Sequence, residues 1–377
     1  MRKVPKLRFK EFSDEWEKLN AEEIFENISN KKHNGDLPVL AVTQDKGVVS
    51  RDSLDLKINS SEEGIKNYKI IEPGNFIISL RSFQGGIEYS NILGIGSPAY
   101  TVLKSKKNIE DIFYKFYLKK SSFISELNKT IEGIRDGKQI SYSMFSKLKL
   151  PYPSIEEQEK IANFLSSIDK KISLTEEKLE LFREYKKGVM QKIFSQELRF
   201  KDSNCNDYPE WEEKRLGEIS KICTGKLDAN AMVENGRYRF YTCAKEFYYI
   251  DSYSFDTEAL LISGNGANVG YIHYYKGKFN AYQRTYVLDN FEENIIFIKY
   301  ILEKNLKTRI EKEKNSGNTP YIVLSVLTDM VLQIPTLEEQ QKIADFLSSI
   351  DNKIESIEKE LEGLKEFKKG LLQQMFV

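Results

Sequence analysis

Two long segments of the chain, residues 153–197 and 335–377, carry apolar residues at alternating spacings of four and three. Such spacing puts apolar side chains on one stripe of an α-helix, and a stripe sustained over many turns is typical of a coiled coil. Each segment is long enough for about 60 Å of helix at 1.5 Å per residue. The stripe positions that we expect to form the helix–helix and partner interface are Ile161, Leu165, Ile168, Ile172 and Leu179 in the first segment and Ile343, Leu347, Ile350, Ile354 and Leu361 in the second.

The two helical segments are copies of one sequence. Residues 156–172 read EEQEKIANFLSSIDKKI and residues 338–354 read EEQQKIADFLSSIDNKI, so 14 of 17 positions agree at an offset of 182. A weaker repeat precedes each copy: Arg8-Phe9-Lys10 followed by Trp16 recurs as Arg199-Phe200-Lys201 followed by Trp211. Repetition of this kind predicts two copies of one structural plan. A pseudo-twofold axis would run the helices antiparallel and place one variable region at each end.

Both helices have a clear starting signal. Ser154 precedes Glu157 by three residues, and Thr336 stands in the same relation to Glu339. This spacing fits the capping box, in which the hydroxyl and the carboxylate each accept a hydrogen bond from an unpaired backbone amide. We therefore expect helices that begin directly after residues 154 and 336.

The regions outside the helices have a β pattern. Aromatic and β-branched runs broken by Gly and Pro predict short strands; they are Leu37–Val42, Asn75–Leu80, Ala99–Leu103, Tyr238–Cys243, Ala259–Ile262, Val269–Tyr275 and Tyr282–Leu288. The two regions align in outline, with Phe76–Ser82 opposite Leu260–Gly266 and Ser97–Tyr100 opposite Gln283–Tyr286. We expect an α+β protein with a first variable region at 1–152, a helix at 153–197, a second variable region at 198–334 and a helix at 335–377.

The composition of the chain limits which classes of function we expect. Lys and Arg number 57, as do Asp and Glu, so the net charge is zero and any positive surface must be local. Three widely spaced cysteines and two histidines leave little material for a metal site or for histidine-based catalysis, and we expect neither catalytic nor metal-binding residues. No run approaches the ~20 apolar residues of a membrane span, so we expect a cytoplasmic protein with no membrane partner.

Polar residues in the loops of the variable regions are candidate DNA contacts. Arginine pairs bidentately with guanine, asparagine and glutamine pair with adenine, and lysine holds phosphates. The candidates are Arg81, Ser82, Gln84 and Arg135 in the first region, Asn265, Asn268, Gln283, Arg284 and Thr285 in the second, and Lys104, Lys245 and Lys278 for phosphates. Two reading regions held apart by helices suit a bipartite DNA site with a fixed gap.

The repeated motifs resemble a known family. The helix starts, the shared Lys-Ile-Ala-x-Phe-Leu-Ser-Ser-Ile-Asp run at 160–169 and 342–351, and the Lys-Lys-Gly endings at 186–188 and 368–370 look like the repeated regions of type I restriction–modification specificity subunits. The first copy departs from the pattern by one extra residue before its helix. The resemblance covers the whole chain.

This resemblance implies two α/β target-recognition domains, separated by two long helices that form an antiparallel coiled coil, each domain reading one half of a split DNA sequence. It implies double-stranded DNA, two modification (methyltransferase) subunits and restriction (translocase and endonuclease) subunits as partners. S-adenosylmethionine, Mg²⁺ and ATP are then expected on those partners, and no cofactor and no catalytic residue on this chain.

Two other interpretations stay open at this point. The chain could be the recognition subunit of another restriction enzyme class, similar to type IIB, that uses the same modular design. It could also be a coiled-coil scaffold without a DNA role, which salt-dependent and sequence-selective duplex binding would distinguish.

Overall fold

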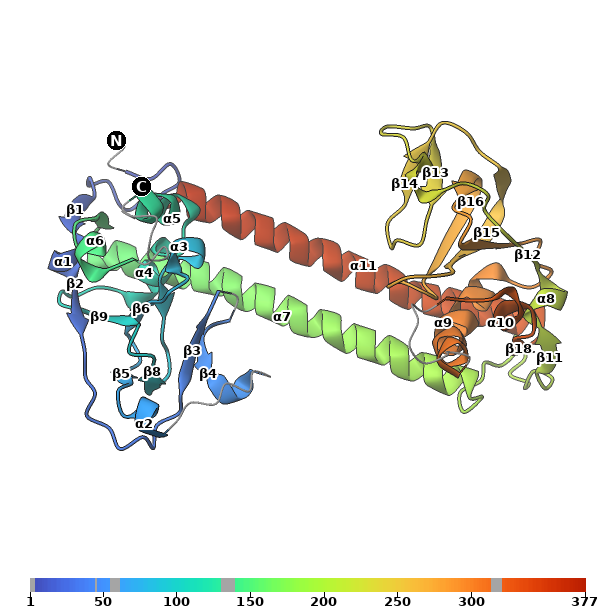
Figure 1. The fold of residues 1–377 in the computed structure, drawn as a ribbon, viewed down its shortest axis with the longest axis horizontal. Helices are drawn as coiled ribbons and strands as arrows, with labels where there is room; N and C mark the ends of the chain where they lie inside the picture. The colour runs from blue at the N-terminus through green and yellow to red at the C-terminus, as the bar shows by residue number, and fades with distance from the viewer. Residues whose placement is uncertain (1–3, 45, 55–61, 130–139, 313–320) are drawn as a thin grey trace. The chain divides into compact units, whose positions relative to one another are not determined.

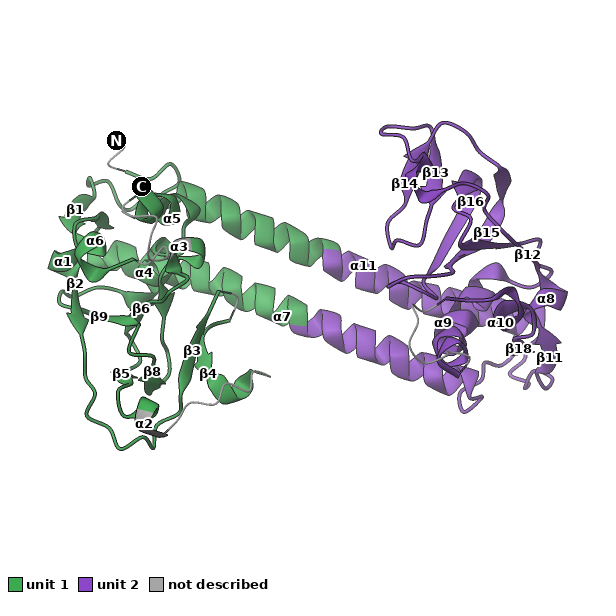
Figure 2. Ribbon diagram, viewed as in Figure 1, with its two compact units in different colours: residues 1–176, 359–377 green, residues 177–358 purple. Residues whose placement is uncertain are grey.

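The computed structural model describes residues 4–44, 46–54, 62–129, 140–312 and 321–377. The chain forms two compact units, which Figure 2 shows in different colours. Unit 1 consists of residues 1–176 and 359–377, and unit 2 of residues 177–358. Each unit combines a β-rich region with the start of one long helix and the end of the other. The four predicted domain limits stay a prediction, because the two units divide each long helix between them.

The two long helices are where the apolar stripe predicts them (Figure 1). Helix α7 spans Ile155–Phe194, 40 residues, and α11 spans Leu337–Gln374, 38 residues. Ion pairs show the direction of the pairing within each unit. In unit 1 Asp169 pairs with Lys368 at 2.5 Å and Glu176 with Lys365 at 2.7 Å; in unit 2 Arg183 pairs with Glu358 at 2.6 Å and Lys186 with Asp351 at 2.7 Å. Residue numbers rise along α7 as those of their partners fall along α11, so the helices are antiparallel.

The predicted stripe is buried most deeply near the start of each helix. Ile161, Leu165, Ile343 and Leu347 are at most 1% exposed, and Leu179 and Ile350 are buried as well. The remaining stripe residues are half-buried: Ile168, Ile172, Ile354 and Leu361. Each start belongs to the hydrophobic core of its own unit and also meets the end of the other helix, since Leu165 shares a core with Leu371 and Met375. The stripe therefore serves the unit cores as well as the helix pair.

The helix starts confirm half of the predicted capping box. The Ser154 hydroxyl accepts the amide of Glu157 at 3.4 Å, and the Thr336 hydroxyl accepts that of Glu339 at 3.5 Å. The two glutamate carboxylates, however, do not turn back to the caps. Each accepts hydrogen bonds from the Arg and Trp of the repeat that precedes its own variable region.

We call these residues the anchor clusters: Arg8, Trp16 and Glu157 in unit 1, and Arg199, Trp211 and Glu339 in unit 2. Arg8 donates to both Glu157 oxygens at 2.8 Å, and Trp16 Nε1 donates at 2.9 Å. In unit 2 the corresponding distances are 3.1 and 2.7 Å from Arg199 and 3.2 Å from Trp211. The carboxylate hydrogen bonds raise the pKa of both arginines, as expected for charge-assisted pairs. Each cluster ties the beginning of a variable region to the start of a long helix.

Unit 1 contains a four-stranded sheet in the order β2-β9-β6-β7 and the strand pairs β1–β10, β3–β4 and β5–β8, all antiparallel. Its elements before α7 are β1 (Glu17–Asn20), α1 (Ala21–Ile24), β2 (Phe25–Ile28), β3 (Leu40–Thr43), β4 (Gly47–Ser50), the 3₁₀ turn η1 (Arg51–Ser53), α2 (Glu62–Ile65), β5 (Lys69–Ile71), β6 (Phe76–Ile78), α3 (Ser82–Gly85), β7 (Glu88–Tyr89), β8 (Gly94–Gly96), β9 (Thr101–Ser105), α4 (Asp111–Tyr117), α5 (Ser121–Lys129), α6 (Tyr142–Phe145) and β10 (Lys149–Tyr152).

Unit 2 contains a six-stranded sheet in the order β12-β17-β15-β16-β13-β14, in which only β13 and β16 run parallel, and the antiparallel pair β11–β18. Its elements between α7 and α11 are β11 (Glu212–Arg215), α8 (Leu216–Ile219), β12 (Lys221–Thr224), the 3₁₀ turn η2 (Ala229–Ala231), β13 (Tyr238–Tyr241), β14 (Tyr248–Ile250), β15 (Phe255–Ser263), β16 (Ile272–Ala281), β17 (Thr285–Asp289), α9 (Ile295–Lys312), α10 (Leu324–Thr328) and β18 (Val331–Ile334).

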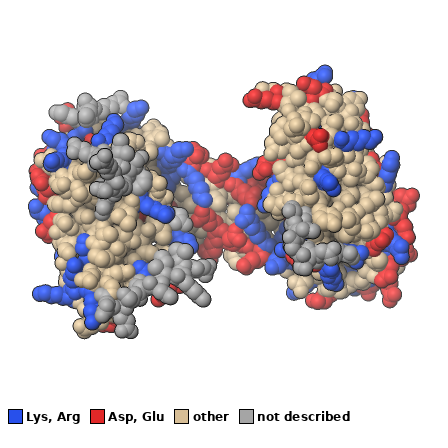
Figure 3. Space-filling view, viewed as in Figure 1, with Lys and Arg blue, Asp and Glu red and all other residues tan. Residues whose placement is uncertain are grey.

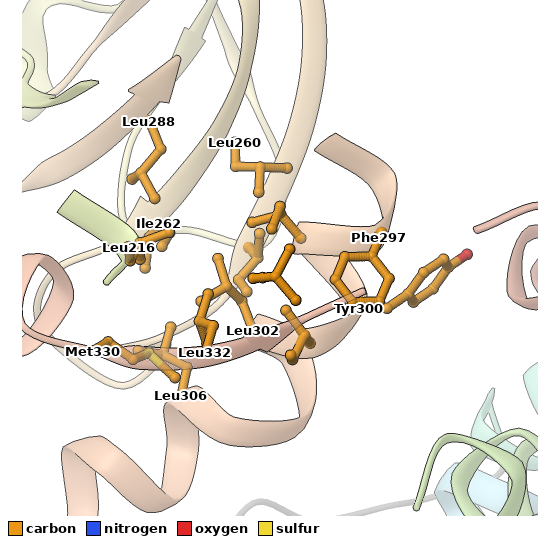
Figure 4. Packing of buried hydrophobic residues seen from close by; sticks show 14 of the residues in the cluster. Leu216, Leu260, Ile262, Leu288, Phe297, Tyr300, Leu302, Leu306, Met330 and Leu332 are labelled. Carbon is orange, nitrogen blue, oxygen red and sulfur yellow. The ribbon is translucent and has the colours of Figure 1, made fainter. Parts of the chain in front are cut away.

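The central strand of each unit is buried on both faces. In β15, Leu260 and Ile262 belong to the core that includes α9, whereas Ala259 and Leu261 belong to a second core on the other face. Because side chains alternate across a strand, a continuous apolar run fits a strand covered on both sides. Figure 4 shows the first of these cores, with sheet residues Leu260, Ile262 and Leu288 close to Phe297, Leu302 and Leu306 of α9.

Every predicted strand overlaps an observed one, although the bounds shift by up to several residues. The observed counterparts, in the order of prediction, are β3, β6, β9, β13, β15, β16 and β17. The outline alignment of the two regions is wrong by one residue. Ile78 pairs with Thr101 and Ile262 pairs with Tyr286, so Thr101, not Tyr100, corresponds to Tyr286. Hydrogen-bond register defines correspondence between sheets, and matching the two tyrosines by type misplaced it.

No helix in the described ranges is both long enough and apolar enough to cross a membrane.

Candidate nucleic-acid interface

One end of the unit 2 sheet gathers most of the predicted contact residues of the second region. We call this set the unit 2 tip: residues 243–245, the turn 264–270 between β15 and β16, and Gln283-Arg284 before β17. The Gly264 amide donates to the Arg284 carbonyl at 2.8 Å, and Asn268 Nδ2 donates to the Cys243 carbonyl at 3.1 Å. Residues far apart in sequence therefore form a single surface. The glycine-rich segment 264–270 joins the antiparallel strands β15 and β16 as the turn of a hairpin.

Glycine is required where the strands of the tip approach each other. A Cβ atom on Gly264 would lie 2.3 Å from the Arg284 carbonyl oxygen, and one on Gly225 would lie 1.9 Å from the Ala281 carbonyl oxygen. Both neighbours are backbone atoms, which cannot rotate away. Gly225 thus lets the segment after β12 pack directly on the end of β16, where Leu227 and Tyr282 form a parallel bridge. The Gln283 amide donates to the Leu227 carbonyl at 2.9 Å beside this bridge.

Arg284 is an exposed cation whose backbone is fixed by two hydrogen bonds at the unit 2 tip. Its carbonyl oxygen accepts the Gly264 amide and the Cys243 thiol, the latter at 3.4 Å, so the side chain projects from a backbone fixed on two sides. Gln283 beside it is exposed, and its Nε2 donates to Asp228 Oδ1 at 2.7 Å. Asn265 is half-buried and forms an antiparallel bridge with Tyr321.

Some predicted contacts are not on an accessible surface. Ser82 is 2% exposed, and its hydroxyl accepts the Ser79 amide at 2.9 Å within the turn that opens α3. Thr285 is 0% exposed on β17. Neither hydroxyl is presented to DNA in this structure, because the Ser82 hydroxyl turns into its own backbone turn and the Thr285 hydroxyl faces the Cys243 sulfur at 4.0 Å. Lys278 is exposed but pairs with Asp256 in the β15–β16 register and lies over the Tyr253 ring, away from the tip.

A hollow of about 730 Å³ adjoins the unit 2 tip and is lined by its turn and by α9. Lys245 and Asn268 line it from the tip, and Lys299 and Lys307 line it from α9, together with Glu303 and Glu311. Its mixture of both charges, rather than a purely basic wall, agrees with the neutral composition. On the face shown in Figure 3, the β-rich part of unit 2 presents broad uncharged surface with few Lys or Arg side chains.

Unit 1 has a smaller counterpart, which we call the unit 1 tip: Gln44, Arg81, Gln84 and Lys119. Gln44 Nε2 donates to Gln84 Oε1 at 2.9 Å, and Lys119 Nζ donates to the Gln44 carbonyl at 3.4 Å. Lys119 also pairs with Glu88, a carboxylate whose burial raises its pKa. Arg81 and Gln84 are exposed. Lys104 is exposed farther along β9, and Arg135 lies outside the described residues.

Several tip residues were missed in the sequence. Asp228 and Gln44 hydrogen-bond to predicted residues across 55 and 40 positions, and Lys119 joins from the loop after α4. Tyr321 is 57% exposed beside Asn265. No local motif marks these residues, because only the sheet register brings them to the tips. His273 contacts the Ala244 carbonyl of the unit 2 tip through Nε2 at 3.0 Å, and burial lowers its pKa.

Fold and tips together define a duplicated two-module protein, in which one β-rich module occurs twice on a pair of antiparallel helices. A family model described as "Type I restriction modification DNA specificity domain" matches residues 13–181 and again 208–366. The chain therefore belongs to the type I restriction–modification DNA specificity family.

Named relatives agree with this assignment. The chain is 40% identical over 167 residues to the type I restriction enzyme EcoDI specificity subunit of Escherichia coli, a match that spans 43% of this chain and 37% of that relative. It is 29% identical over 397 residues to the MjaVIII specificity subunit of Methanocaldococcus jannaschii, covering 95% of this chain and 91% of the relative.

Solved structures share the fold. The S subunit of a type I restriction–modification system from M. genitalium superposes with a TM-score of 0.63 at 18% identity, covering 99% of each chain. A chain from a study of complex assembly and conformational transition of the type I system gives a TM-score of 0.55 at 16% identity, covering 96% of this chain and 97% of that one. At these identities the comparison shows the fold alone. The expected α+β architecture is confirmed: two β-rich domains and two long antiparallel helices related by an internal repeat.

Proposed function

We propose that this chain is the DNA-binding specificity subunit of a type I restriction–modification complex. Each β-rich region is a target-recognition domain that reads one half of a bipartite sequence, and the helices dock two modification subunits. The observation that carries the proposal is the duplication itself: two anchor clusters with the same hydrogen bonds support two tips with different polar side chains. A shared scaffold with different tips is what two readers of different half-sites need.

The chemistry of the tips supports DNA as the ligand. Arg81, Gln84, Asn265 and Arg284 are types that pair with base edges, and Lys119 and Lys245 lie at the same tips as candidates for phosphate contacts. The net charge of zero suits a DNA-binding subunit whose partner subunits supply part of the contacts to the phosphates. A scaffold role without DNA gives no reason for two unlike polar tips, and the named relatives are specificity subunits of type I enzymes.

Catalysis belongs to the partners in this proposal. The modification subunits hold S-adenosylmethionine and methylate adenine, and the restriction subunits use ATP and Mg²⁺. This chain supplies the sequence choice and the platform for assembly, in the cytoplasm where the DNA lies.

A methylome tests the proposal. The chain is coexpressed with its modification subunit, and methylated adenines are mapped by single-molecule sequencing. A split motif with an adenine methylated in each half, absent without this chain, is the expected result. A stable, active complex that methylates no new motif contradicts sequence reading by this chain.

Arg284→Ala should relax one half-site. An arginine–guanine pair contributes about 1–3 kcal/mol of discrimination, so we expect methylation of the second-domain half-site to lose roughly tenfold or more of its preference at one base pair. The other half-site should stay unchanged, because its reader belongs to unit 1. Lys278→Ala, which removes an exposed cation away from the tip, is the matched control. Equal relaxation of both halves by Arg284→Ala would contradict modular reading.

A further inference from the structure

A second hollow opens in unit 1, lined by residues other than those of the unit 1 tip. It has a volume of about 690 Å³ and forms where the β1–β10 pair, α5 and the segment after α11 meet. Its lining includes the buried apolar residues Tyr117, Leu148 and Phe376. Five lysines and one acid complete its charged lining: Lys6, Lys18, Lys129, Lys147, Lys149 and Glu126. The hollow is therefore apolar at its base and strongly basic at its rim.

The rim charges are poorly balanced. Lys6, Lys129, Lys147 and Lys149 are exposed, and they form no ion pair among the residues that the structure describes. Lys120 lies beneath them, mostly buried, and donates to the Phe376 carbonyl at 3.1 Å. Burial lowers the pKa of Lys120, and the positive charge of Lys18 lowers it further. A cation here experiences the field of its neighbours, which an incoming anion would relieve.

The internal repeat supplies a counterpart of this rim in unit 2. Strand register equates Glu17–Tyr152 with Glu212–Ile334, so Lys18 corresponds to Glu213 and Lys149 to Val331. The Leu148 carbonyl accepts a hydrogen bond from the Ala21 amide at 2.8 Å, and the Met330 carbonyl accepts one from the Leu216 amide at 2.9 Å. Leu148 therefore corresponds to Met330, and the preceding Lys147 corresponds to Asp329.

The fourth correspondence comes from the ends of the long helices. The Leu7 amide donates to the Gln374 carbonyl at 2.9 Å, and the Leu198 amide donates to the Lys192 carbonyl at 3.1 Å. Lys192 and Gln374 are 182 positions apart, which is the offset of the helix repeat. Lys6 therefore corresponds to Glu197. Four rim lysines of unit 1 are replaced in unit 2 by three acids and a valine. One change runs the other way, since Asn20 corresponds to Arg215.

We infer that the unit 1 hollow binds an acidic segment of a partner protein that also carries an apolar side chain. Lysines at the rim complement carboxylates, and the apolar base accepts a side chain that a phosphate backbone does not have. A protein segment therefore fits this hollow better than DNA does. Because the unit 2 counterpart has the opposite charge, the partner segment binds once per chain. This surface breaks the pseudo-twofold symmetry that the helices and anchor clusters keep, and it is separate from the proposed reading of DNA.

The test uses the full chain and a short fluorescein-labelled peptide in which a Phe-Leu pair is flanked on both sides by glutamates. The variant Lys6→Glu/Lys147→Asp/Lys149→Val installs the residues that unit 2 carries at the same positions, which the scaffold accepts there. Lys10→Glu/Lys32→Glu/Lys107→Val makes the same change in net charge at exposed positions of unit 1 outside the hollow. Binding is measured by fluorescence anisotropy, with circular dichroism to verify the fold of each variant.

The peptide should bind the chain and the control variant alike, and the hollow variant should bind about tenfold more weakly or worse, a change of about 1.4 kcal/mol. Replacing the Phe-Leu pair by alanines should also weaken binding. No saturable binding, equal binding by the hollow variant, or indifference to the alanine replacement would each overturn the inference. So would displacement of the peptide by a short DNA duplex that itself loses affinity for the hollow variant, because the site would then hold phosphates.

Discussion

Replacing Glu339 with alanine should lower the free energy of unfolding of unit 2 by about 3 kcal/mol, because it leaves charged and polar groups without partners. The carboxylate is 0% exposed and accepts hydrogen bonds from Arg199 at 3.1 and 2.7 Å and from Trp211 at 3.2 Å. Removing one member of a buried pair costs more than the pair itself contributes. Urea denaturation measures the change, and hydrogen exchange assigns it to unit 2.

Glu338→Ala is the matched control, one residue away. The Glu338 side chain is 60% exposed, forms a 3.5 Å ion pair with Lys342 and accepts a hydrogen bond from the Tyr208 hydroxyl at 2.8 Å, so its loss should cost about 1 kcal/mol. Glu157→Ala should repeat the large effect in unit 1, where the same three groups meet. If Glu339→Ala costs no more than Glu338→Ala, the anchor cluster does not hold the variable region to its helix.

Gly225→Ala should have the second large effect, on stability and on DNA reading together. The added Cβ would lie 1.9 Å from the Ala281 carbonyl oxygen and 2.6 Å from that of Tyr282, so the backbone must separate. Overpacking of this kind typically costs 1–3 kcal/mol, and a clash with backbone at both neighbours places it at about 3 kcal/mol. Because Gln283 and Arg284 follow directly, methylation of the second half-site should fall while the first persists. Thermal unfolding and the methylome measure the two effects.

Gly363→Ala on α11 is the control for adding a methyl group. Nothing lies within 4 Å of a Cβ at Gly363, which is exposed in the middle of a helix. Alanine is favoured over glycine there by up to about 1 kcal/mol, so this variant should be slightly more stable. A Gly225→Ala protein as stable as the parent chain would show that the two segments separate there at no cost.

The repeat and the apolar periodicity could be recognised in the sequence, because both depend on the order of residue types and not on which residues are in contact. The stripe through Leu165 and Leu347 predicted two long helices, and the apolar run at 259–262 predicted a strand. Hydrophobic spacing decides such elements from neighbouring residues alone. The candidate contacts followed from residue type, and the structure brings Asn265, Asn268, Gln283 and Arg284 to one tip. They remain predictions until DNA binding is measured.

The errors concern contacts that residue type alone does not reveal. Glu157 and Glu339 looked like capping residues, but Arg8 and Arg199 lie 149 and 140 positions away and take their carboxylates. Ser82 and Thr285 were expected at the surface, but Ser82 is buried in the turn that opens α3 and Thr285 is buried in β17. Correspondence between the two sheets was wrong by one residue, because side-chain type was compared without hydrogen-bond register.

By itself, the sequence determined that this protein is one module written twice, with long helices, β-rich variable regions and membership of a recognisable family. These features depend on periodicity and repetition, which need no knowledge of which residues meet. Only the tertiary structure decided which residues of the repeat meet. It determined which carboxylate anchors which region, which polar side chains share a tip, and where the two copies differ in charge. Those properties arise from contacts across the chain, and sheet register and packing set them.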